Sequence, residues 1–146
     1  MTIQTVHGNI LLTKQECIVI PVNCVGVMGA GLALLARHKW PEMAKSYAYA
    51  CACNQVRVGH IWTYKDDNNT IICFPTKDHW RNSSQMSFIV SGLISLNTFI
   101  TVYRPNSIAI PKLGCGHGGL LWKDVLPQIE YYLESAAKVC DIYLYL

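Results

Sequence analysis

One arrangement occurs twice in this sequence and constrains the fold more than any other feature. A short apolar run ends in a glycine-rich loop, and the loop leads into a helix-forming segment. In the first copy, Cys17-Ile-Val-Ile-Pro-Val22 is followed by a loop up to Gly31 and by the segment 32–37. In the second, 107–111 is followed by Leu113-Gly-Cys-Gly-His-Gly-Gly119 and a helical pattern from about Trp122 to Lys138. Such apolar runs are typical of central strands covered on both faces.

The segments around these two copies also alternate between strand and helix patterns. We expect strands at 3–7, 58–64, 70–74 and 141–146, and a helix at 42–52 that Pro41 opens. Ser84 is a plausible N-cap for a helix that runs to about Thr98. The segment 32–37 has little polar face, so we expect that helix to be largely buried. This order predicts an α/β fold with a mixed, mostly parallel sheet and helices on both faces.

Composition supports one domain, residues 1–146, with a large core. Hydrophobic residues make up 51% of the chain and charged residues 14%, which argues against disorder. The net charge of +3 is only mildly basic. We expect no membrane span and no signal peptide. The seven cysteines, an odd number without a secretory signal, predict free thiols in the cytoplasm.

The two glycine-rich loops carry the first functional prediction. Glycines let the backbone approach a ligand and expose consecutive N–H groups, and a helix N-terminus adds positive potential. Two such loops at the carboxyl ends of parallel strands can clamp a pyrophosphate. The alternative is a pair of tight turns required only by packing. Neither loop has the G-x-x-x-x-G-K-S/T or G-x-G-x-x-G pattern, so a P-loop ATPase and a dehydrogenase are not expected.

The stretch Phe74-Pro-Thr-Lys-Asp-His-Trp-Arg81 places charged groups just past a predicted strand end. A desolvated Lys77 could act as a nucleophile, although an ordinary solvated lysine fits the same pattern. Cys115 near His117 is a weaker nucleophile candidate. The histidines do not fall at zinc-ligand spacings, so no metal is expected.

Three of these stretches together resemble the macrodomain family, and the resemblance spans nearly the whole chain. They are 21–33, 74–81 and Ile110-Pro-Lys-Leu-Gly-Cys-Gly-His-Gly-Gly119 with Trp122. The chain is most similar to the branch that contains the DNA ADP-ribosyl glycohydrolase antitoxins, and more distantly to human terminal ADP-ribose glycohydrolase. The resemblance implies a three-layer α/β/α macrodomain that binds ADP-ribose without a cofactor.

The resemblance also implies a role for particular residues. Lys77 falls on the catalytic lysine of this branch, and Asn9 replaces the aspartate that commonly accepts a hydrogen bond from adenine. Trp80 and Arg81 are candidates for contact with DNA. The full set expected to bind ADP-ribose is Gly8, Asn9, Ile10, Asn23, Val27, Met28, Gly29, Gly31, Leu32, Thr76, Gly114, Cys115, Gly116, His117, Gly118 and Gly119.

By this resemblance the chain removes ADP-ribose from a base, thymine, in single-stranded DNA, and pairs with a DNA ADP-ribosyltransferase. Three alternatives stay open: hydrolysis of ADP-ribosylated protein, hydrolysis of ADP-ribose 1″-phosphate, and binding without catalysis. Two departures from the family pattern bear on this. Ile20 stands where many macrodomains have an asparagine, and the stretch 117–119 lacks the carboxylate of the human relative. Antitoxins of this type usually carry a further C-terminal region, so direct binding to a toxin is not expected of 1–146.

Overall fold

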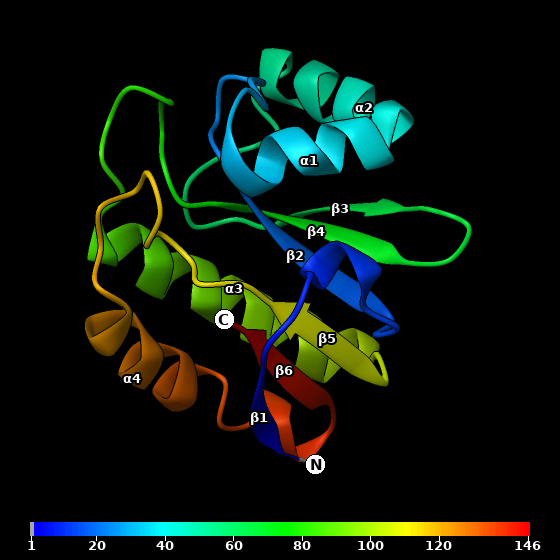
Figure 1. Ribbon diagram of the computed structural model, residues 1–146, viewed down its shortest axis with the longest axis vertical. Coiled ribbons are helices and arrows are strands. Elements are labelled where there is room, and N and C mark those ends of the chain that lie inside the picture. Colours follow the sequence, from blue (N-terminus) through cyan, green and yellow to red (C-terminus); the bar gives the residue numbers. More distant parts are fainter. Residues whose placement is uncertain (1) are drawn as a thin grey trace.

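The computed structural model describes residues 2–146, in which strands and helices alternate as expected (Figure 1). The elements in chain order are β1 (Ile3–Val6), η1 (Ile10–Leu12), β2 (Cys17–Val22), α1 (Gly31–Lys39), α2 (Pro41–Ala52), β3 (Trp62–Lys65), β4 (Thr70–Pro75), α3 (Met86–Tyr103), β5 (Ser107–Ile110), α4 (Trp122–Tyr132), η2 (Ala136–Lys138) and β6 (Asp141–Tyr145).

The strands form a single six-stranded sheet in the order β1-β6-β5-β2-β4-β3. Every neighbouring pair is parallel except β3 and β4, which form an antiparallel hairpin. The two strands that precede the glycine-rich loops, β2 and β5, are therefore neighbours at the centre of the sheet. Their carboxyl ends, with that of β4, open toward the same edge, as the repeated arrangement in the sequence predicts.

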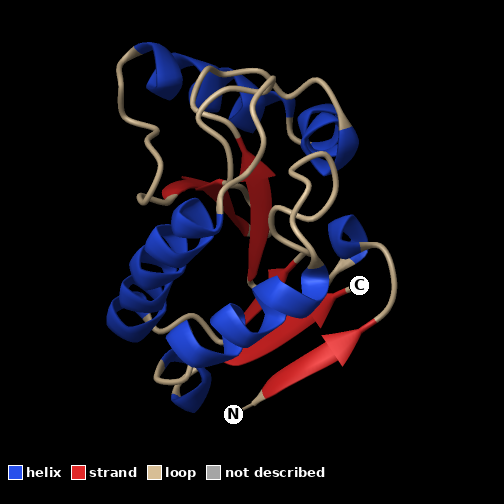
Figure 2. Ribbon diagram, turned by 90° about the vertical axis from the view of Figure 1, so that its left-hand side faces the viewer, coloured by secondary structure: helices blue, strands red, loops and turns tan. Residues whose placement is uncertain are grey.

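Helices cover both faces of the sheet (Figures 1 and 2). α1, α2 and η1 lie on one face, and α3 and α4 lie on the other. Alternate residues of β2 divide between the two cores: Ile18 and Ile20 pack under α2, and Val19 packs under α3. The three-layer α/β/α architecture is thus confirmed, and its cause is the apolar character of both faces of the central strands.

Two helices differ in length from the sequence prediction. Ser84 is not the N-cap of α3, which begins at Met86 after Gln85 and continues to Tyr103. The Ser84 N–H instead donates to the Gly118 carbonyl at 3.0 Å, so this residue is used to join two loops. α4 ends at Tyr132 rather than near Lys138 because the chain turns there, and the Asn97 side chain accepts the Ala136 N–H at 3.0 Å.

The prediction that the first of these helices is largely buried is wrong. Only Ala36 of α1 is fully buried, and Leu35 is 54% exposed. α1 packs against α2 and β2 on one side only. Its first residues, Gly31 to Ala33, line a cavity. The small number of polar residues in this helix is therefore not a sign of burial in the core.

The prediction that no segment could span a membrane also needs correction. By length and composition alone, α3 is apolar enough to cross one, with a mean hydropathy of 1.6. In this fold α3 covers the sheet, and Ile89, Leu93, Leu96 and Ile100 are fully buried in the core. The apolar residues on the side of α3 that faces the sheet are therefore explained by packing in the core.

Candidate functional site

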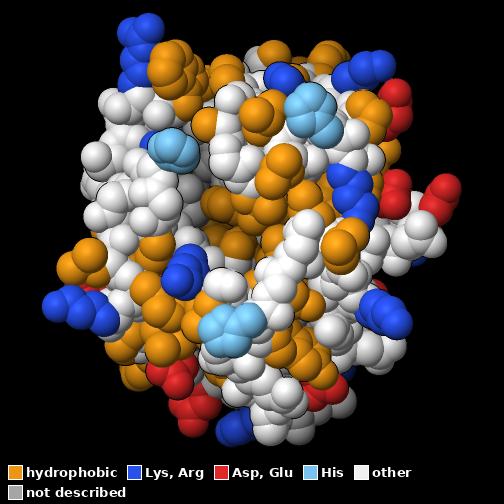
Figure 3. Space-filling view, in the orientation of Figure 1, with side chains coloured by type: hydrophobic (Ala, Val, Ile, Leu, Met, Phe, Trp, Pro, Cys, Tyr) orange, Lys and Arg blue, Asp and Glu red, His pale blue; other side chains and the backbone are white. Residues whose placement is uncertain are grey.

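A cavity of about 960 Å³ lies over the carboxyl ends of β2, β4 and β5. Three segments surround it: residues 23–30 (the β2 loop), 76–85 (the β4 loop) and 111–121 (the β5 loop). The space-filling view shows hydrophobic side chains at the bottom of a hollow, with basic and histidine side chains around it (Figure 3). A cavity of this size is in the range that holds a nucleotide-sized ligand.

The β2 loop is shaped by the buried side chain of Asn23. Its Oδ1 accepts the Val25 N–H and the Tyr47 hydroxyl, both at 3.0 Å, and its Nδ2 donates to the Val27 carbonyl at 2.8 Å. Gly26 sits at φ +88° against the Cα of Ala48, a place suited only to glycine. Asn23 therefore lines the cavity, but its polar atoms serve mainly to fix the loop.

The β5 loop is a tight turn that leaves backbone N–H groups free. The Leu120 N–H donates to the Gly114 carbonyl at 2.9 Å, and the Gly119 N–H donates to Gly116 at 3.2 Å. Within residues 2–146, the N–H groups of Gly116, His117 and Gly118 donate to no protein acceptor. Consecutive unpaired N–H groups form a concavity that binds anions.

The two glycine-rich loops approach each other over the cavity. Gly31 has φ +56°, and a Cβ there would lie 3.8 Å from Cδ2 of His117. The backbone N–H groups at Gly29 and Ala30 are also unpaired within the described residues, and α1 begins directly after them. Free N–H groups thus border the cavity from both sides, together with the positive end of a helix.

Lys77 lies in the β4 loop, and contacts from the β2 loop fix the position of its backbone. Cys24 donates its N–H to the Asp78 carbonyl at 3.1 Å, and its thiol contacts the Lys77 carbonyl oxygen at 3.6 Å. The Lys77 side chain is half-buried, and its Nζ lies 3.4 Å from the Trp80 carbonyl oxygen. The amine is therefore held near the rim without a carboxylate beside it.

Asp78 stabilises the turn that follows Lys77. Its Oδ1 accepts the side-chain N–H of Asn82 at 3.0 Å and the His79 N–H at 2.7 Å. These two hydrogen bonds lower the pKa of the Asp78 carboxyl below its ordinary value, the bond from Asn82 contributing most. Asp78 therefore acts on the shape of the β4 loop, and its carboxylate is used within that loop.

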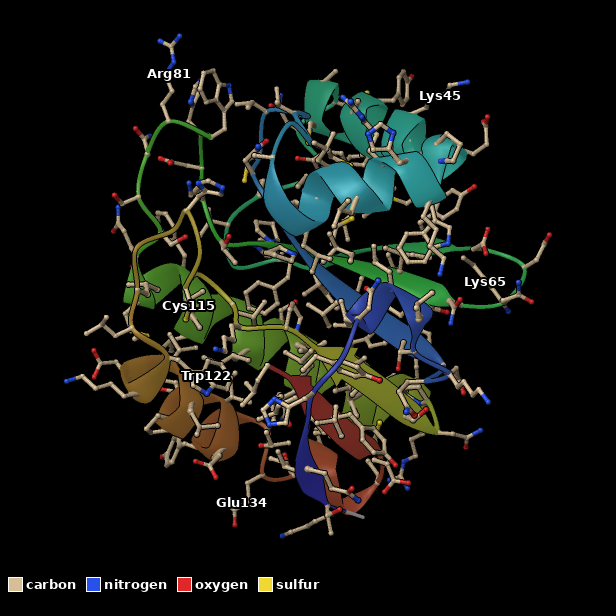
Figure 4. All side chains as sticks on the ribbon, viewed as in Figure 1. Lys45, Lys65, Arg81, Cys115, Trp122 and Glu134 are labelled. Carbon is tan, nitrogen blue, oxygen red and sulfur yellow. The ribbon has the colours of Figure 1, made fainter. Side chains whose placement is uncertain are left out.

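Trp80 and Arg81 form the outer end of the β4 loop. Trp80 is 46% exposed and lines the cavity, and the Arg81 guanidinium lies 4.7 Å from the centroid of its ring. Figure 4 shows Arg81 pointing outward, away from the cavity, whereas Cys115 lies on the β5 loop and Trp122 at the start of α4. Trp80 is thus a partly exposed aromatic surface beside Lys77.

The charge of the cavity lining has one sign. Lys77, Lys112 and His117 line it, and no aspartate or glutamate does so among the described residues. Residues 2–146 also contain no cluster of three His, Cys, Asp or Glu residues that could hold a metal ion. Burial raises the pKa of the Cys115 thiol, which disfavours the thiolate that a cysteine nucleophile requires.

Most of the residues predicted to form the site do line this cavity. They are Asn23, Val27, Gly29, Gly31, Leu32, Thr76, Lys77, Trp80, Gly114, Cys115, Gly116, His117 and Gly118. Six predicted residues do not: Gly8, Asn9, Ile10, Met28, Arg81 and Gly119. Asn9 caps η1, where its Oδ1 accepts the Leu11 N–H at 3.0 Å, and Met28 is buried in the core.

Sequence reasoning missed part of the cavity lining. These residues are Pro21, Val22, Ala30, Ala33, Pro111, Lys112, Leu120, Leu121 and Trp122. Two of them could have been found, because an Ile-Pro pair lies at or near the end of both central apolar runs and places Pro21 and Pro111 close to the carboxyl ends of the strands. Lys112, directly after the second pair, gave no signal of its own.

Comparisons with known proteins agree on one family. A model described as "Macro domain" matches residues 19–129. A DNA ADP-ribosyl glycohydrolase from Thermus aquaticus is 40% identical over 144 residues, which are 96% of this chain and 40% of that protein. A DNA ADP-ribosyl transferase–DNA ADP-ribosyl glycohydrolase fusion protein from Thermosipho africanus is 30% identical over 95% of this chain and 41% of its own length.

Solved structures give the same result. The macrodomain of Mycobacterium tuberculosis DarG superposes with a TM-score of 0.94 at 36% identity, covering 99% of this chain and 97% of that one. Thermosipho africanus DarTG in complex with ADP-ribose gives a TM-score of 0.89 at 32% identity, covering 98% of this chain and 41% of that one. The chain spans about 40% of the length of the curated relatives that it matches.

Proposed function

This chain belongs to the macrodomain family, and we propose that it is an ADP-ribosyl glycohydrolase that removes ADP-ribose from thymine bases in DNA. One observation supports this most strongly. Lys77, which is half-buried, lines a cavity that is bordered by unpaired backbone N–H groups. Such a cavity suits a pyrophosphate, and the lysine suits attack on the sugar attached to it.

In this proposal the pyrophosphate of ADP-ribose lies between the β2 and β5 loops. The free N–H groups of Gly116, His117 and Gly118 hold one phosphate, and those near Gly29 hold the other. The distal ribose then lies toward the β4 loop, beside Lys77. The adenine lies toward η1, where the side-chain Oδ1 of Asn9 accepts one N–H and still has a lone pair for the adenine amino group.

Lys77 is the proposed nucleophile. Its amine, after losing a proton, attacks the anomeric carbon of the distal ribose with its nitrogen lone pair. The bond between that carbon and the base breaks, and the base leaves with the electron pair and takes up a proton. Water then attacks the sugar carbon, releases ADP-ribose and regenerates the amine. The anchored phosphates hold the carbon close to Lys77, which lowers the entropic part of the barrier.

The identity of the acceptor rests on Trp80 and on the relatives. The exposed ring of Trp80 beside Lys77 offers a stacking surface for a base, and stacking on aromatic side chains is the usual way to hold single-stranded nucleic acid. Leu121, 56% exposed, adds apolar surface at the same cavity. The Thermus aquaticus relative is described as a DNA ADP-ribosyl glycohydrolase, and the Thermosipho africanus relative combines that activity with a DNA ADP-ribosyl transferase. We therefore include pairing with a DNA ADP-ribosyltransferase in the proposal.

The compartment in this proposal is the cytoplasm, which holds DNA in bacteria and keeps thiols reduced. All seven cysteines are free thiols, as expected of a protein in a reducing compartment. Cys53 is exposed at the surface, so an oxidant would reach it first.

Lys77→Ala tests the catalytic step. The substrate is a short single-stranded oligonucleotide with one ADP-ribosylated thymidine, and the readout is released ADP-ribose. We expect turnover to fall by at least about 1,000-fold while the Kd for ADP-ribose stays within about threefold of the unaltered protein. Lys123→Ala, an exposed lysine on α4 outside the cavity, is the matched control and should keep full activity.

A non-catalytic binder is the second candidate, because no aspartate or glutamate among residues 2–146 lines the cavity to act as a general acid or base. The same experiment separates the two. If the unaltered protein binds ADP-ribose but releases none from the oligonucleotide, the DNA glycohydrolase proposal fails. ADP-ribosylated protein and ADP-ribose 1″-phosphate are the substrates to try next.

A further inference from the structure

Lys112 is a second cation in the cavity, and nothing in the proposed reaction uses it. It lies two residues after the end of β5, is exposed, and lines the same cavity as Lys77. β2 lies between β4 and β5, so the ends of the strands that carry the two lysines are separated by two strand spacings, about 10 Å. The two lysines therefore line the cavity from the ends of strands on either side of β2.

Lys112 belongs to the β5 loop and lines the cavity with it. Burial raises the pKa of the Cys115 thiol, and the charge of Lys112 partly offsets that rise. Lys112 and Cys115 line the same cavity, and the three residues after Cys115 carry the unpaired N–H groups. The Lys112 carbonyl also accepts the Cys115 N–H at 3.2 Å, so the lysine backbone is part of the same turn.

No anion of the protein neutralises Lys112. Among residues 2–146 the only ion pair joins Lys45 to Glu42, far from the cavity in α2, and no carboxylate lines the cavity. The positive charge of Lys112 thus adds to the potential of the free N–H groups. Two independent sources of positive potential line the same cavity, which is an arrangement that suits a phosphate group.

We propose that Lys112 binds the phosphate group that the N–H groups of Gly116 to Gly118 hold. The inference rests on the proposed binding of ADP-ribose and extends it by dividing the work between two lysines. Lys112 contributes to affinity for the bound nucleotide, in the substrate and in the product alike. Lys77 contributes to the reaction and little to affinity, because it faces the far end of the ligand.

The test is the affinity of the whole chain for ADP-ribose, measured by isothermal titration calorimetry at low and at high NaCl. Lys112→Gln removes the charge and keeps much of the side chain. We expect its Kd at low salt to be about tenfold weaker than that of the unaltered protein, the size of a lost charge-assisted hydrogen bond at an exposed site. Lys112→Arg should retain most of the affinity, because it keeps the charge.

Lys123→Gln is the matched control, since it makes the same change in net charge at an exposed lysine outside the cavity. It should leave the Kd unchanged. High salt should narrow the difference between the unaltered protein and Lys112→Gln, because screening weakens the interaction that the variant lacks. On an active substrate, Lys112→Gln should raise KM and leave kcat within about twofold.

The outcomes keep the inference apart from the proposed function. If Lys112→Gln and Lys123→Gln bind ADP-ribose as well as the unaltered protein at low salt, Lys112 does not bind the phosphate, and the inference is wrong while the proposed function stands. If Lys112→Gln lowers kcat instead of raising KM, the division between the lysines is wrong. If the unaltered protein does not bind ADP-ribose at all, both fail together.

Discussion

Gly118 is the residue on which the shape of the β5 loop depends most directly. A Cβ at this position would lie 2.4 Å from the Gly114 carbonyl oxygen and 2.4 Å from Oγ of Ser84. The Gly114 carbonyl belongs to the backbone of the same turn and accepts the Leu120 N–H, so it cannot move freely. The Ser84 hydroxyl has no hydrogen-bond partner among the described residues and can rotate. Gly118→Ala must therefore widen the turn of the β5 loop.

Gly116, two residues earlier, has no atom within 4 Å of where its Cβ would be. Neither glycine has a positive φ, so backbone conformation does not distinguish them. Overpacking a well-packed site costs about 1–3 kcal/mol, and contacts with backbone place Gly118→Ala near 2–3 kcal/mol. For a domain of this size that lowers Tm by about 4–12 °C. Gly116→Ala should change Tm by no more than about 4 °C, and upward, since alanine restricts the unfolded chain.

Differential scanning calorimetry of the two variants beside the unaltered protein measures the stability, and ADP-ribose titration measures the function. Gly116→Ala should fold normally, because its Cβ meets no atom within 4 Å. It should bind ADP-ribose more weakly, because Gly116 lines the cavity. Gly118→Ala should lose stability even without ligand. Equal melting temperatures for the two variants would refute the steric reasoning, because they would show that the loop widens at little cost.

Two further predictions concern the core. A Cβ at Gly92 on α3 would lie 2.3 Å from Cζ of Phe74, so Gly92→Ala should lower Tm strongly. Adding Phe74→Leu to the same chain should recover part of the loss. Additive effects of the two substitutions in a double-mutant cycle would contradict this. Burial raises the pKa of Cys17 and of Cys140 to about 12, and that of Cys24 to about 11, against an ordinary value of 9.0. Because folding favours the neutral thiols, their contribution to stability is complete below pH 9 and is lost as the pH rises toward 11–12. Urea titrations at increasing pH should therefore give a falling free energy of unfolding. A free energy of unfolding that does not change over this range would contradict the assignment.

The sequence predicted the central sheet well because its signals are local. The apolar run of β2 and the turn before β4 gave strands with nearly correct ends. Helix α1 was placed correctly and its burial was not, since nothing local distinguishes a core helix from one that borders a cavity. The ends of α3 and α4 depend on distant partners: Ser84 bonds to Gly118, and Asn97 bonds to Ala136. Such partners are not visible in a single sequence.

The cavity was predictable where glycine patterns mark it and unpredictable where its residues look ordinary. Gly114 to Gly118 were found from the loop pattern, whereas Lys112 was not. Asn23 was expected to contact ligand and lines the cavity, but its side chain already bonds to its own loop and to the Tyr47 hydroxyl on α2. A sequence shows that a polar residue stands at a strand end. Only the folded chain shows whether its polar atoms are already in use.

Backbone hydrogen bonds also join the loops that surround the cavity to one another. Cys24 in the β2 loop bonds to the backbone of Asp78 in the β4 loop, and Ser84 at the end of the β4 loop bonds to Gly118 in the β5 loop. The Lys77 backbone therefore has a defined position relative to the N–H groups that are proposed to hold the phosphates. A nucleophile gains most when its target carbon is fixed with respect to it. In the proposed complex the anion is held mainly by backbone groups, so this linkage would orient Lys77 without a carboxylate beside its amine.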